Sequence, residues 1–323
     1  MAKVAEIPDY RLVDSADILV GMTAMTVENW GGTSRYADLD GPVHYVDFGG
    51  PDNPDAPTVV LVHGLGGSHL NWCLLAPRLV GHAHVVAVDL AGFGLTNPEG
   101  RRTTVAANAR LLNRFLREVV GKPVVLVGNS MGGMISILQT AANPDTVTAL
   151  ALVDPALPLT FGIRPDPLVM STFFLYALPG IGERVLAKAR SGQTPRQQVK
   201  RVMNLVCADA KVVPEELVLA SMTLVELRAE VPGLDEAFLV AAKSIVFVNA
   251  RRGAYWRAMR NIKVPVFLMA GDRDRLVPIG SARATAARNP NWRFDVFEGI
   301  GHVPQIETPE VVSARLLDWL GSR

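Results

Sequence analysis

A serine near the middle of the chain stands in a setting that suits nucleophilic chemistry. Ser130 lies in the sequence GNSMG, with Gly128 and Gly132 two residues before and after it. An apolar, β-branched run at 124–127 precedes this turn, and a helical pattern at 134–142 follows it. Strand, tight turn and helix in this order form a nucleophile elbow, which holds a serine exposed at the carboxyl end of a sheet. The sequence therefore predicts that Ser130 is a nucleophile.

A serine hydroxyl needs a base within hydrogen-bond reach and a third group that orients the base. His302 follows the last strand pattern and is the predicted base. In the elbow arrangement the acid precedes the histidine in the chain, and both Asp272 and Asp274 directly follow the strand pattern before it. Asp274 is favoured, because Asp272 can instead bond to the backbone of its own loop. Asp154, after an earlier strand pattern, is a third candidate for the acid and fits better as a turn residue before proline.

A glycine-rich bend, HGLGG at 63–67, follows another buried-strand pattern. Acyl transfer develops a negative oxygen that needs N–H donors aimed at it. The bend allows the Leu65 amide to point inward, and the Met131 amide stands at a helix start, where unpaired N–H groups favour an anion. These two amides are the predicted oxyanion hole, and Gly64 and Asn129 beside them are expected to contact the substrate. His63 is expected to be structural, hydrogen-bonded beneath the loop.

The elements that must position these residues alternate along the chain from residue 43 onward. Such alternation predicts right-handed crossovers and a mostly parallel central sheet with helices on both faces. The predicted strands lie at 43–48, 58–62, 84–88, 124–127, 149–153, 264–270 and 293–297. The predicted helices of this core lie at 70–79, from a cap at Thr103 or Thr104 to 119, and at 134–142 and 309–320.

Between 156 and 250 helical periodicity replaces the strand patterns. Segments separated by proline or glycine lie at 168–178, 181–189, 195–207, 214–229 and 234–248. We interpret this block as a helical cap, inserted into a core that comprises 39–155 and 251–323. Residues 1–38 form an N-terminal extension, whose helical pattern at 14–30 is expected to pack on its own domain.

Composition and charge narrow the classes of partner. The chain has 323 residues, 49% hydrophobic and 20% charged, with 32 basic and 31 acidic residues and a net charge of +1. This balance argues against nucleic acid as a partner. The start of the chain lacks the pattern of a secretory signal, and no apolar run is long enough to span a membrane. We therefore expect a cytoplasmic protein, and homo-oligomer formation is left open.

The two cysteines, Cys73 and Cys207, lie far apart among apolar residues and are expected to be buried free thiols. No G-x-G-x-x-G opens a helix after a strand, and no phosphate-binding loop is present. No group of histidine, cysteine and aspartate has the spacing of metal ligands. We therefore expect neither a cofactor nor a metal.

The motifs HGLGG, DLAGFG, GNSMGG, GDRD and GIGH, in this order, resemble those of the α/β-hydrolase superfamily. The resemblance extends from about residue 42 to 320 and is to its cap-bearing serine hydrolases, which include bacterial esterases and meta-cleavage-product hydrolases. It implies the α/β-hydrolase fold with a helical cap. It also implies that Ser130 is the nucleophile, His302 the base and Asp274 the orienting acid.

Departures from family patterns favour one reaction over others. Epoxide hydrolases and haloalkane dehalogenases carry an aspartate where Ser130 stands. The meta-cleavage-product hydrolases, which break C–C bonds, often share an asparagine before the serine, as in Asn129. However, they tend to carry a tryptophan after the histidine and a glycine-rich turn before the cap, where this chain has Val303 and the sequence DPAL at 154–157. We therefore expect a carboxylesterase-like enzyme, with a C–C bond hydrolase as the alternative and a non-catalytic hydrolase-fold binding protein after it.

The predicted cap is rich in apolar and flexible side chains that suit an apolar ester substrate. They are Met170, Phe173, Phe174, Leu175, Tyr176, Leu178, Met203, Met222 and Phe238. Trp72, Phe93 and Val303 lie near the predicted site in the sequence pattern and are expected to line the pocket.

Overall fold

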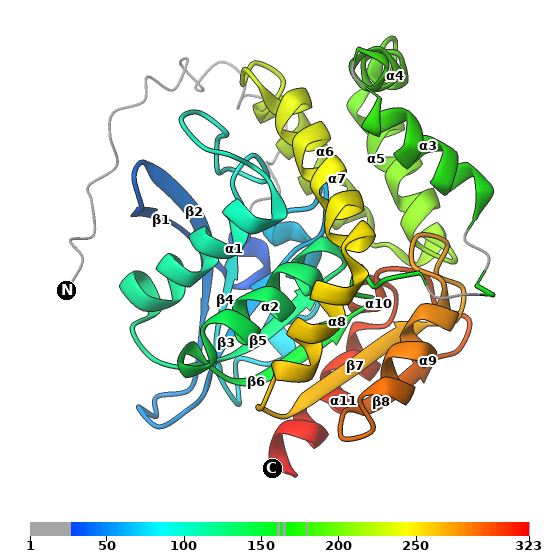
Figure 1. Ribbon diagram of the computed structural model, residues 1–323. Coiled ribbons are helices and arrows are strands. Elements are labelled where there is room, and N and C mark those ends of the chain that lie inside the picture. The colour runs from blue at the N-terminus through cyan, green and yellow to red at the C-terminus, as the bar shows by residue number, and fades with distance from the viewer. Residues whose placement is uncertain (1–26, 160–161, 164–165, 179, 323) are drawn as a thin grey trace.

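The computed structural model describes residues 27–159, 162–163, 166–178 and 180–322. In this part of the chain an eight-stranded sheet has the order β1-β2-β4-β3-β5-β6-β7-β8 (Figure 1). β2 pairs antiparallel with β1 and with β4, and every other neighbouring pair is parallel, which confirms the predicted mostly parallel sheet. The strands are β1 (Thr33–Asp38), β2 (Pro42–Gly49), β3 (Thr58–Val62), β4 (His84–Val88), β5 (Val124–Asn129), β6 (Val147–Val153), β7 (Val266–Gly271) and β8 (Arg293–Phe297).

The central strands are buried on both faces, which explains their continuous apolar sequences. In β3, Val59 and Leu61 pack into the hydrophobic cluster on one face of the sheet, and Val60 and Val62 into the cluster on the other. Alternate side chains of a strand point to opposite faces, and a fully buried valine or leucine contributes about 1.5–3 kcal/mol. The seven strands predicted from such runs correspond to β2 through β8.

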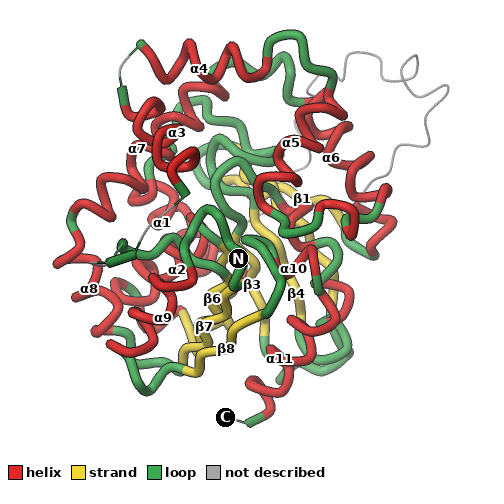
Figure 2. The backbone as a smooth tube through the Cα atoms, turned by 90° about the vertical axis from the view of Figure 1, so that its right-hand side faces the viewer, coloured by secondary structure: helices red, strands yellow, loops and turns green. Residues whose placement is uncertain are grey.

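Helices cover both faces of the sheet (Figure 2). One side carries α1 (Val105–Arg114), α2 (Met131–Ala142), α8 (Arg252–Asn261) and α9 (Ile279–Arg288), and the other carries α10 (Pro304–Glu307) and α11 (Pro309–Gly321). Thr104 caps α1 by accepting a hydrogen bond from the Ala107 amide at 3.2 Å, and a π-helix, η4 (Phe115–Val120), continues it. The predicted helix from this cap to residue 119 is thereby confirmed.

The chain between β6 and β7 is helical, as predicted. It comprises α3 (Pro167–Ala177), α4 (Ile181–Arg190), α5 (Pro195–Val206), η6 (Ala210–Val212), α6 (Glu215–Leu227), α7 (Leu234–Ala250) and α8. Figure 1 shows α3 to α7 gathered beyond one end of the sheet, whereas α8 returns to the side of α2. The division of the chain into a core and a cap at 156–250 stays an interpretation of this arrangement.

One predicted helix is wrong. The segment 70–79 forms two short 3-10 helices, η2 (His69–Trp72) and η3 (Ala76–Arg78), in place of one α-helix. Pro77 explains the break, because proline has no N–H to donate and its ring clashes with the carbonyl four residues earlier. It is tolerated at the start of η3, where the amide needs no partner.

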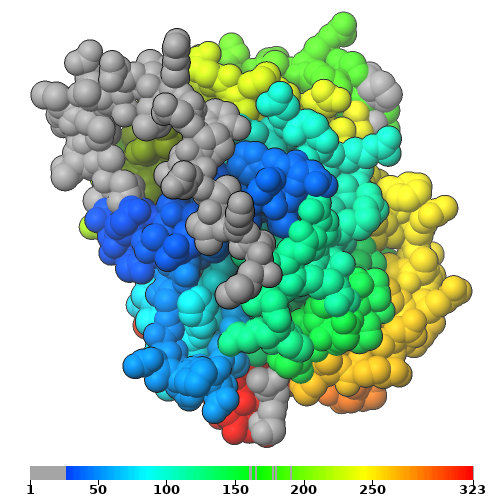
Figure 3. Space-filling model, turned by 90° about the vertical axis from the view of Figure 1, so that its left-hand side faces the viewer, coloured from blue at the N-terminus to red at the C-terminus, as the bar shows by residue number. Residues whose placement is uncertain are grey.

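The N-terminal part of the chain adds a strand that the sequence pattern did not indicate. β1 lies in the segment 1–38 that was interpreted as an extension, and its residues are almost all exposed, so it lacks the alternation of a half-buried strand. The blue segment around β1 and β2 is at the surface in Figure 3. Val27–Trp30 forms the 3-10 helix η1, and the rest of the predicted helix at 14–30 lies outside the described residues.

Two further expectations concern cysteines and membranes. Cys73 and Cys207 are both buried and free, as predicted. None of the helices in the described part of the chain combines the length and hydropathy that crossing a bilayer requires.

Candidate active site

Ser130 occupies a strained turn between β5 and α2. Its backbone has φ 55° and ψ −120°, a region that non-glycine residues adopt at a cost of about 1–3 kcal/mol. The two flanking glycines make the turn feasible. A Cβ atom on Gly128 would lie 2.6 Å from the Gly132 carbonyl oxygen, and one on Gly132 would lie 2.2 Å from the Val62 carbonyl oxygen. The turn therefore presses directly against the end of β3, which fixes where the serine stands.

His302 and Asp274 form a buried pair in the loops after β8 and β7. His302 Nδ1 lies 2.7 Å from Asp274 Oδ2. The other carboxylate oxygen of Asp274 accepts hydrogen bonds from the Leu276 and Val277 amides at 2.7 and 3.0 Å. Because an ionised carboxylate can only accept, Nδ1 carries the proton and leaves Nε2 with a free lone pair. Asp272 is exposed and instead accepts from the Gly299 amide at 2.7 Å, so the geometry places Asp274 beside His302.

The Nε2 atom of His302 is buried and has no hydrogen-bond partner among the described residues. A buried polar atom without a partner is uncommon in folded proteins and calls for an explanation. The described residues include no hydrogen bond between Ser130 Oγ and this nitrogen. Such bonds are often long before substrate binds. An unpaired basic nitrogen is what a proton acceptor requires.

Asn129 links the serine turn to the histidine loop. Its side-chain amide donates to the Val153 carbonyl at 2.9 Å and to the His302 carbonyl at 3.1 Å. The side chain is buried, and both of these bonds go to the protein backbone. Asn129 therefore holds the end of β5 to the backbone of His302.

The glycine-rich loop after β3 passes beside the serine. A Cβ atom on Gly64 would lie 2.8 Å from Ser130 Cβ. The Gly67 amide donates to the Gly64 carbonyl at 3.1 Å across a turn in which Gly66 has φ 72°, a conformation that glycine adopts without strain. Leu65 lies within this turn and Met131 is the first residue of α2, where backbone amides lack helical partners. Their role as oxyanion donors stays a prediction.

His63 lies beneath this loop, as predicted. It is fully buried, its Nδ1 donates to the Gly64 carbonyl at 2.8 Å, and its Nε2 accepts from the Leu90 amide at 3.0 Å. Burial lowers the pKa of His63, so the imidazole is neutral and both nitrogens are used. This arrangement supports the loop from below and leaves no nitrogen free for catalysis.

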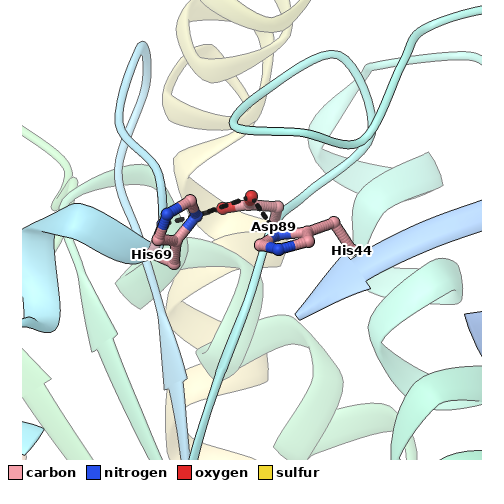
Figure 4. A group of neighbouring side chains, drawn as sticks. All are labelled: His44, His69 and Asp89. Carbon is pink, nitrogen blue, oxygen red and sulfur yellow. Dashed lines mark hydrogen bonds and ion pairs between the residues drawn. The ribbon is translucent and has the colours of Figure 1, made fainter. Parts of the chain in front are cut away.

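A second polar cluster, which sequence spacing did not indicate, supports the same loops (Figure 4). Asp89 Oδ2 lies 2.7 Å from His44 Nδ1 and 2.9 Å from His69 Nδ1. Its oxygens also accept from the backbone amides of His69 and Leu95 at 2.7 and 2.8 Å. Burial alone would raise the pKa of Asp89, but His69 and His44 outweigh burial and hold it well below its usual range.

This cluster explains a glycine of the DLAGFG motif. A Cβ atom on Gly94 would lie 2.0 Å from the Asp89 carboxylate, so the 90–96 loop can close over Asp89 only with glycine there. Ligand-type atoms of His44, His69 and Asp89 lie within 4.8 Å of one another. In the structure these atoms are used in mutual hydrogen bonds, which account for the buried charge without a metal ion.

Glu307 is a further residue that the sequence did not single out. Its carboxylate accepts from the Gly301 amide at 2.8 Å and, on the other oxygen, from the Ala208 amide at 2.8 Å. The His302 amide also donates to the Val206 carbonyl at 2.7 Å. The loop that carries His302 is thus bound to the end of α5, so the helices between β6 and β7 are connected to the predicted base.

Three of the predicted pocket residues are buried. Trp72, Phe93 and Val303 have exposed fractions of 0%, 3% and 2% and belong to the hydrophobic clusters under the sheet and its loops. Contact of these side chains with a substrate stays a prediction.

Aromatic side chains of the inserted helices reach the glycine-rich loop. A Cβ atom on Gly66 would lie 3.3 Å from the ring of Phe238 in α7. The Phe238 ring meets that of Tyr176 edge to face at 5.6 Å, and Tyr176 meets Phe173 at 6.4 Å. All three side chains are half-buried. An aromatic surface therefore extends from α3 to the loop beside Ser130.

Comparison with known proteins adds a family model and several relatives. A model described as the alpha/beta hydrolase family matches residues 59–315. The dihydrolipoyllysine-residue acetyltransferase component of an acetoin-cleaving system from Cupriavidus necator is 27% identical over 291 residues, which cover 89% of this chain and 69% of that protein. The 2-hydroxy-6-oxononadienedioate/2-hydroxy-6-oxononatrienedioate hydrolase of Cupriavidus pinatubonensis is 26% identical over 302 residues, or 90% of this chain and 96% of that protein.

A solved structure shares the fold. The thermophilic esterase of Thermogutta terrifontis has a TM-score of 0.66 and 22% identity, with 90% of this chain and 98% of that chain covered. At this identity the likeness concerns the arrangement of the backbone, and the reaction must be argued from the residues of the site.

Proposed function

Because the chain belongs to the alpha/beta hydrolase family, we propose that it is a serine hydrolase that cleaves carboxylic esters with an apolar acyl group. One observation carries this proposal: the buried pair of Asp274 and His302, 2.7 Å apart, has an unpartnered Nε2 at the strand ends where the Ser130 elbow stands. Nucleophile, base and orienting acid are the three groups that acyl transfer from an ester requires.

In the proposed mechanism His302 Nε2 takes the proton of Ser130 as Oγ attacks the ester carbonyl. Asp274 orients the imidazole and stabilises its positive charge. The amides of Leu65 and Met131 hold the oxyanion of the tetrahedral intermediate, and loss of one such donor typically costs a factor on the order of 10²–10³ in kcat. His302 then protonates the leaving alcohol and activates the water that hydrolyses the acyl-enzyme.

The preference for an apolar acyl group rests on the surface beside the serine. Phe238 lies against Gly66 and continues through Tyr176 to Phe173. Aromatic rings bury large apolar areas with few rotatable bonds, and ligand sites are commonly lined by such side chains with few polar groups. An acyl chain that leaves the Ser130 oxygen in this direction would meet apolar surface.

A C–C bond hydrolase is the second candidate, favoured by the relative from Cupriavidus pinatubonensis and by Asn129 before the serine. Both departures noted above argue against it. Val303 stands where those enzymes tend to carry a tryptophan, and its side chain is 2% exposed. Asp154, in the turn before the inserted helices, is buried in place of a flexible glycine-rich segment. A non-catalytic binding protein is disfavoured because serine, histidine and aspartate are all retained.

Hydrolysis of p-nitrophenyl esters from acetate to palmitate, by the wild type and by Ser130→Ala, tests the proposal. Loss of the nucleophile of a working triad typically lowers kcat by a factor on the order of 10⁶, so activity should vanish in this variant. The exposed Ser191 offers a matched control, and Ser191→Ala should retain full activity. A folded wild type that cleaves none of these esters, but does cleave a vinylogous dienone acid, would reject esterase activity in favour of C–C hydrolysis.

A further inference from the structure

A second carboxyl group is buried behind the Asp274–His302 pair. Asp154 follows β6, its exposed fraction is 2%, and its φ is 42°. A positive φ is uncommon for residues other than glycine and is retained where surrounding structure enforces it. One oxygen of its carboxyl, one of Asp274 and a ring nitrogen of His302 all lie within 4.8 Å of one another. The turn thus directs an acidic side chain inward, to the back of the predicted site.

Backbone contacts fix this side chain against the strand that leads to Asp274. The Gly271 amide donates to the two oxygens of Asp154 at 3.0 and 3.3 Å. The Asp154 amide in turn donates to the Met269 carbonyl at 2.9 Å. Asp154 is therefore attached on both sides to the end of β7, three residues before Asp274.

Two adjacent buried carboxyl groups do not both ionise, because like charges at short range in a poorly solvated site repel strongly. Asp274 has three donors, the Leu276 amide, the Val277 amide and His302 Nδ1. Asp154 has only the Gly271 amide, and within the described residues no salt bridge joins it to an arginine or lysine. The negative charge therefore belongs on Asp274 and the proton on Asp154.

The charges around Asp154 agree with this assignment. Burial and then the neighbouring charge of Asp274 raise the pKa of Asp154 well above its usual range, and the more distant Glu307 acts in the same direction. The other titratable group at this point is His302, which faces Asp274.

We propose that Asp154 is a neutral carboxylic acid that donates a hydrogen bond to Asp274 and thereby positions the Asp274–His302 pair for the hydrolase reaction proposed above. Asp154 does not contact substrate and acts through Asp274, so it is a positioning residue. Its donated bond gives the Asp274 carboxylate a fourth fixed partner, and its neutrality keeps a second negative charge away from the imidazole. Ionisation of Asp154 at alkaline pH would break this bond and disturb the pair.

Two variants separate these roles kinetically. Asp154→Asn supplies an N–H for Asp274 and a carbonyl for the Gly271 amide, and it cannot ionise. It should retain kcat within about threefold and lose the alkaline fall in rate that the wild type shows. Asp154→Ala removes the bond to a charged group and should lower kcat about tenfold or more, with KM little changed. A purely structural role would leave the alkaline limb the same in the wild type and Asp154→Asn, which would overturn the proposal.

A spectroscopic test does not depend on turnover. Infrared spectra of the folded full-length protein at neutral pH should contain the C=O stretch of a protonated buried carboxylic acid, and Asp154→Asn should remove it. Asp52→Asn, which alters an exposed aspartate, should leave it in place. A wild type without a band that Asp154→Asn removes would show that Asp154 is ionised and refute the inference, even if esters are hydrolysed as proposed. A band lost only in Asp154→Asn supports it, even if the substrate proves to be of another class.

Discussion

Replacing Glu307 with alanine should loosen the loop that carries His302 and lower both stability and turnover. Glu307 lies in α10 and joins this loop to the end of α5 through its two carboxylate oxygens. No other side chain in the described part of the chain accepts a hydrogen bond from the Gly301 amide. The buried Gly301 N–H therefore loses its partner in Glu307→Ala.

The size of the effect follows from these contacts. Two bonds are short, at 2.8 Å to the Gly301 and Ala208 amides, and a third to the Asp209 amide is long, at 3.4 Å. Hydrogen bonds to a charged group contribute about 1.5–3 kcal/mol each. Burial raises the pKa of Glu307, so desolvation offsets part of that gain, and water can replace the acceptor at the exposed Ala208. We expect a net loss of about 2 kcal/mol in the free energy of unfolding.

Urea denaturation and ester hydrolysis measure the two consequences. Glu307→Ala should unfold at lower urea concentration and show a lower kcat, because the His302 backbone becomes mobile. Glu310→Ala is a matched control three residues along the chain, where an exposed carboxylate pairs with Arg78 and its loss should cost under about 1 kcal/mol. If Glu307→Ala is as stable and as active as this control, the loop is held by other contacts and the reasoning is wrong.

Two further changes test the supports of the site. Gly132→Ala places a Cβ 2.2 Å from the Val62 carbonyl and should destabilise the fold by more than about 3 kcal/mol in urea denaturation, whereas Gly253→Ala, in open space, should be neutral or stabilising; equal effects would contradict the packing argument. Asp89→Asn leaves His44 and His69 without a charged partner and should cost about 3–5 kcal/mol. The pKa of Asp89 is depressed in the folded state, so its stabilisation is present above the unfolded value of about 4 and is lost as pH falls below it; Asp89→Asn should flatten this acid-side loss, and an unchanged pH dependence of unfolding would count against the charge assignment.

The features that the sequence predicts well are those set by local pattern. Buried strands appear as short β-branched runs, and the elbow glycines stand at fixed positions because a Cβ at either one would meet the backbone. β1 escapes prediction because an exposed edge strand needs no apolar face. The helix expected at 70–79 fails because a single proline at position 77 outweighs favourable spacing.

Contacts between distant parts of the chain account for what the sequence could not predict. Asp89 meets His44 across 45 positions and His69 across 20, and Glu307 reaches the Ala208 amide across 99. No short motif reports such pairings, since each residue alone looks like an ordinary loop or helix residue. Asp154 was weighed only as a rival to Asp274, and its burial beside that residue, visible only in three dimensions, gives it a different role.

The account rests on one central claim, that Ser130 is activated by His302 to form an acyl-enzyme. Intact-protein and peptide mass spectrometry after treatment with a p-nitrophenyl alkylphosphonate, which reacts with an activated serine, tests this claim most directly. The account predicts a single adduct on the peptide that contains Ser130, absent from Ser130→Ala and formed far more slowly by His302→Ala. An adduct on another residue, or none on a folded wild type, would contradict it.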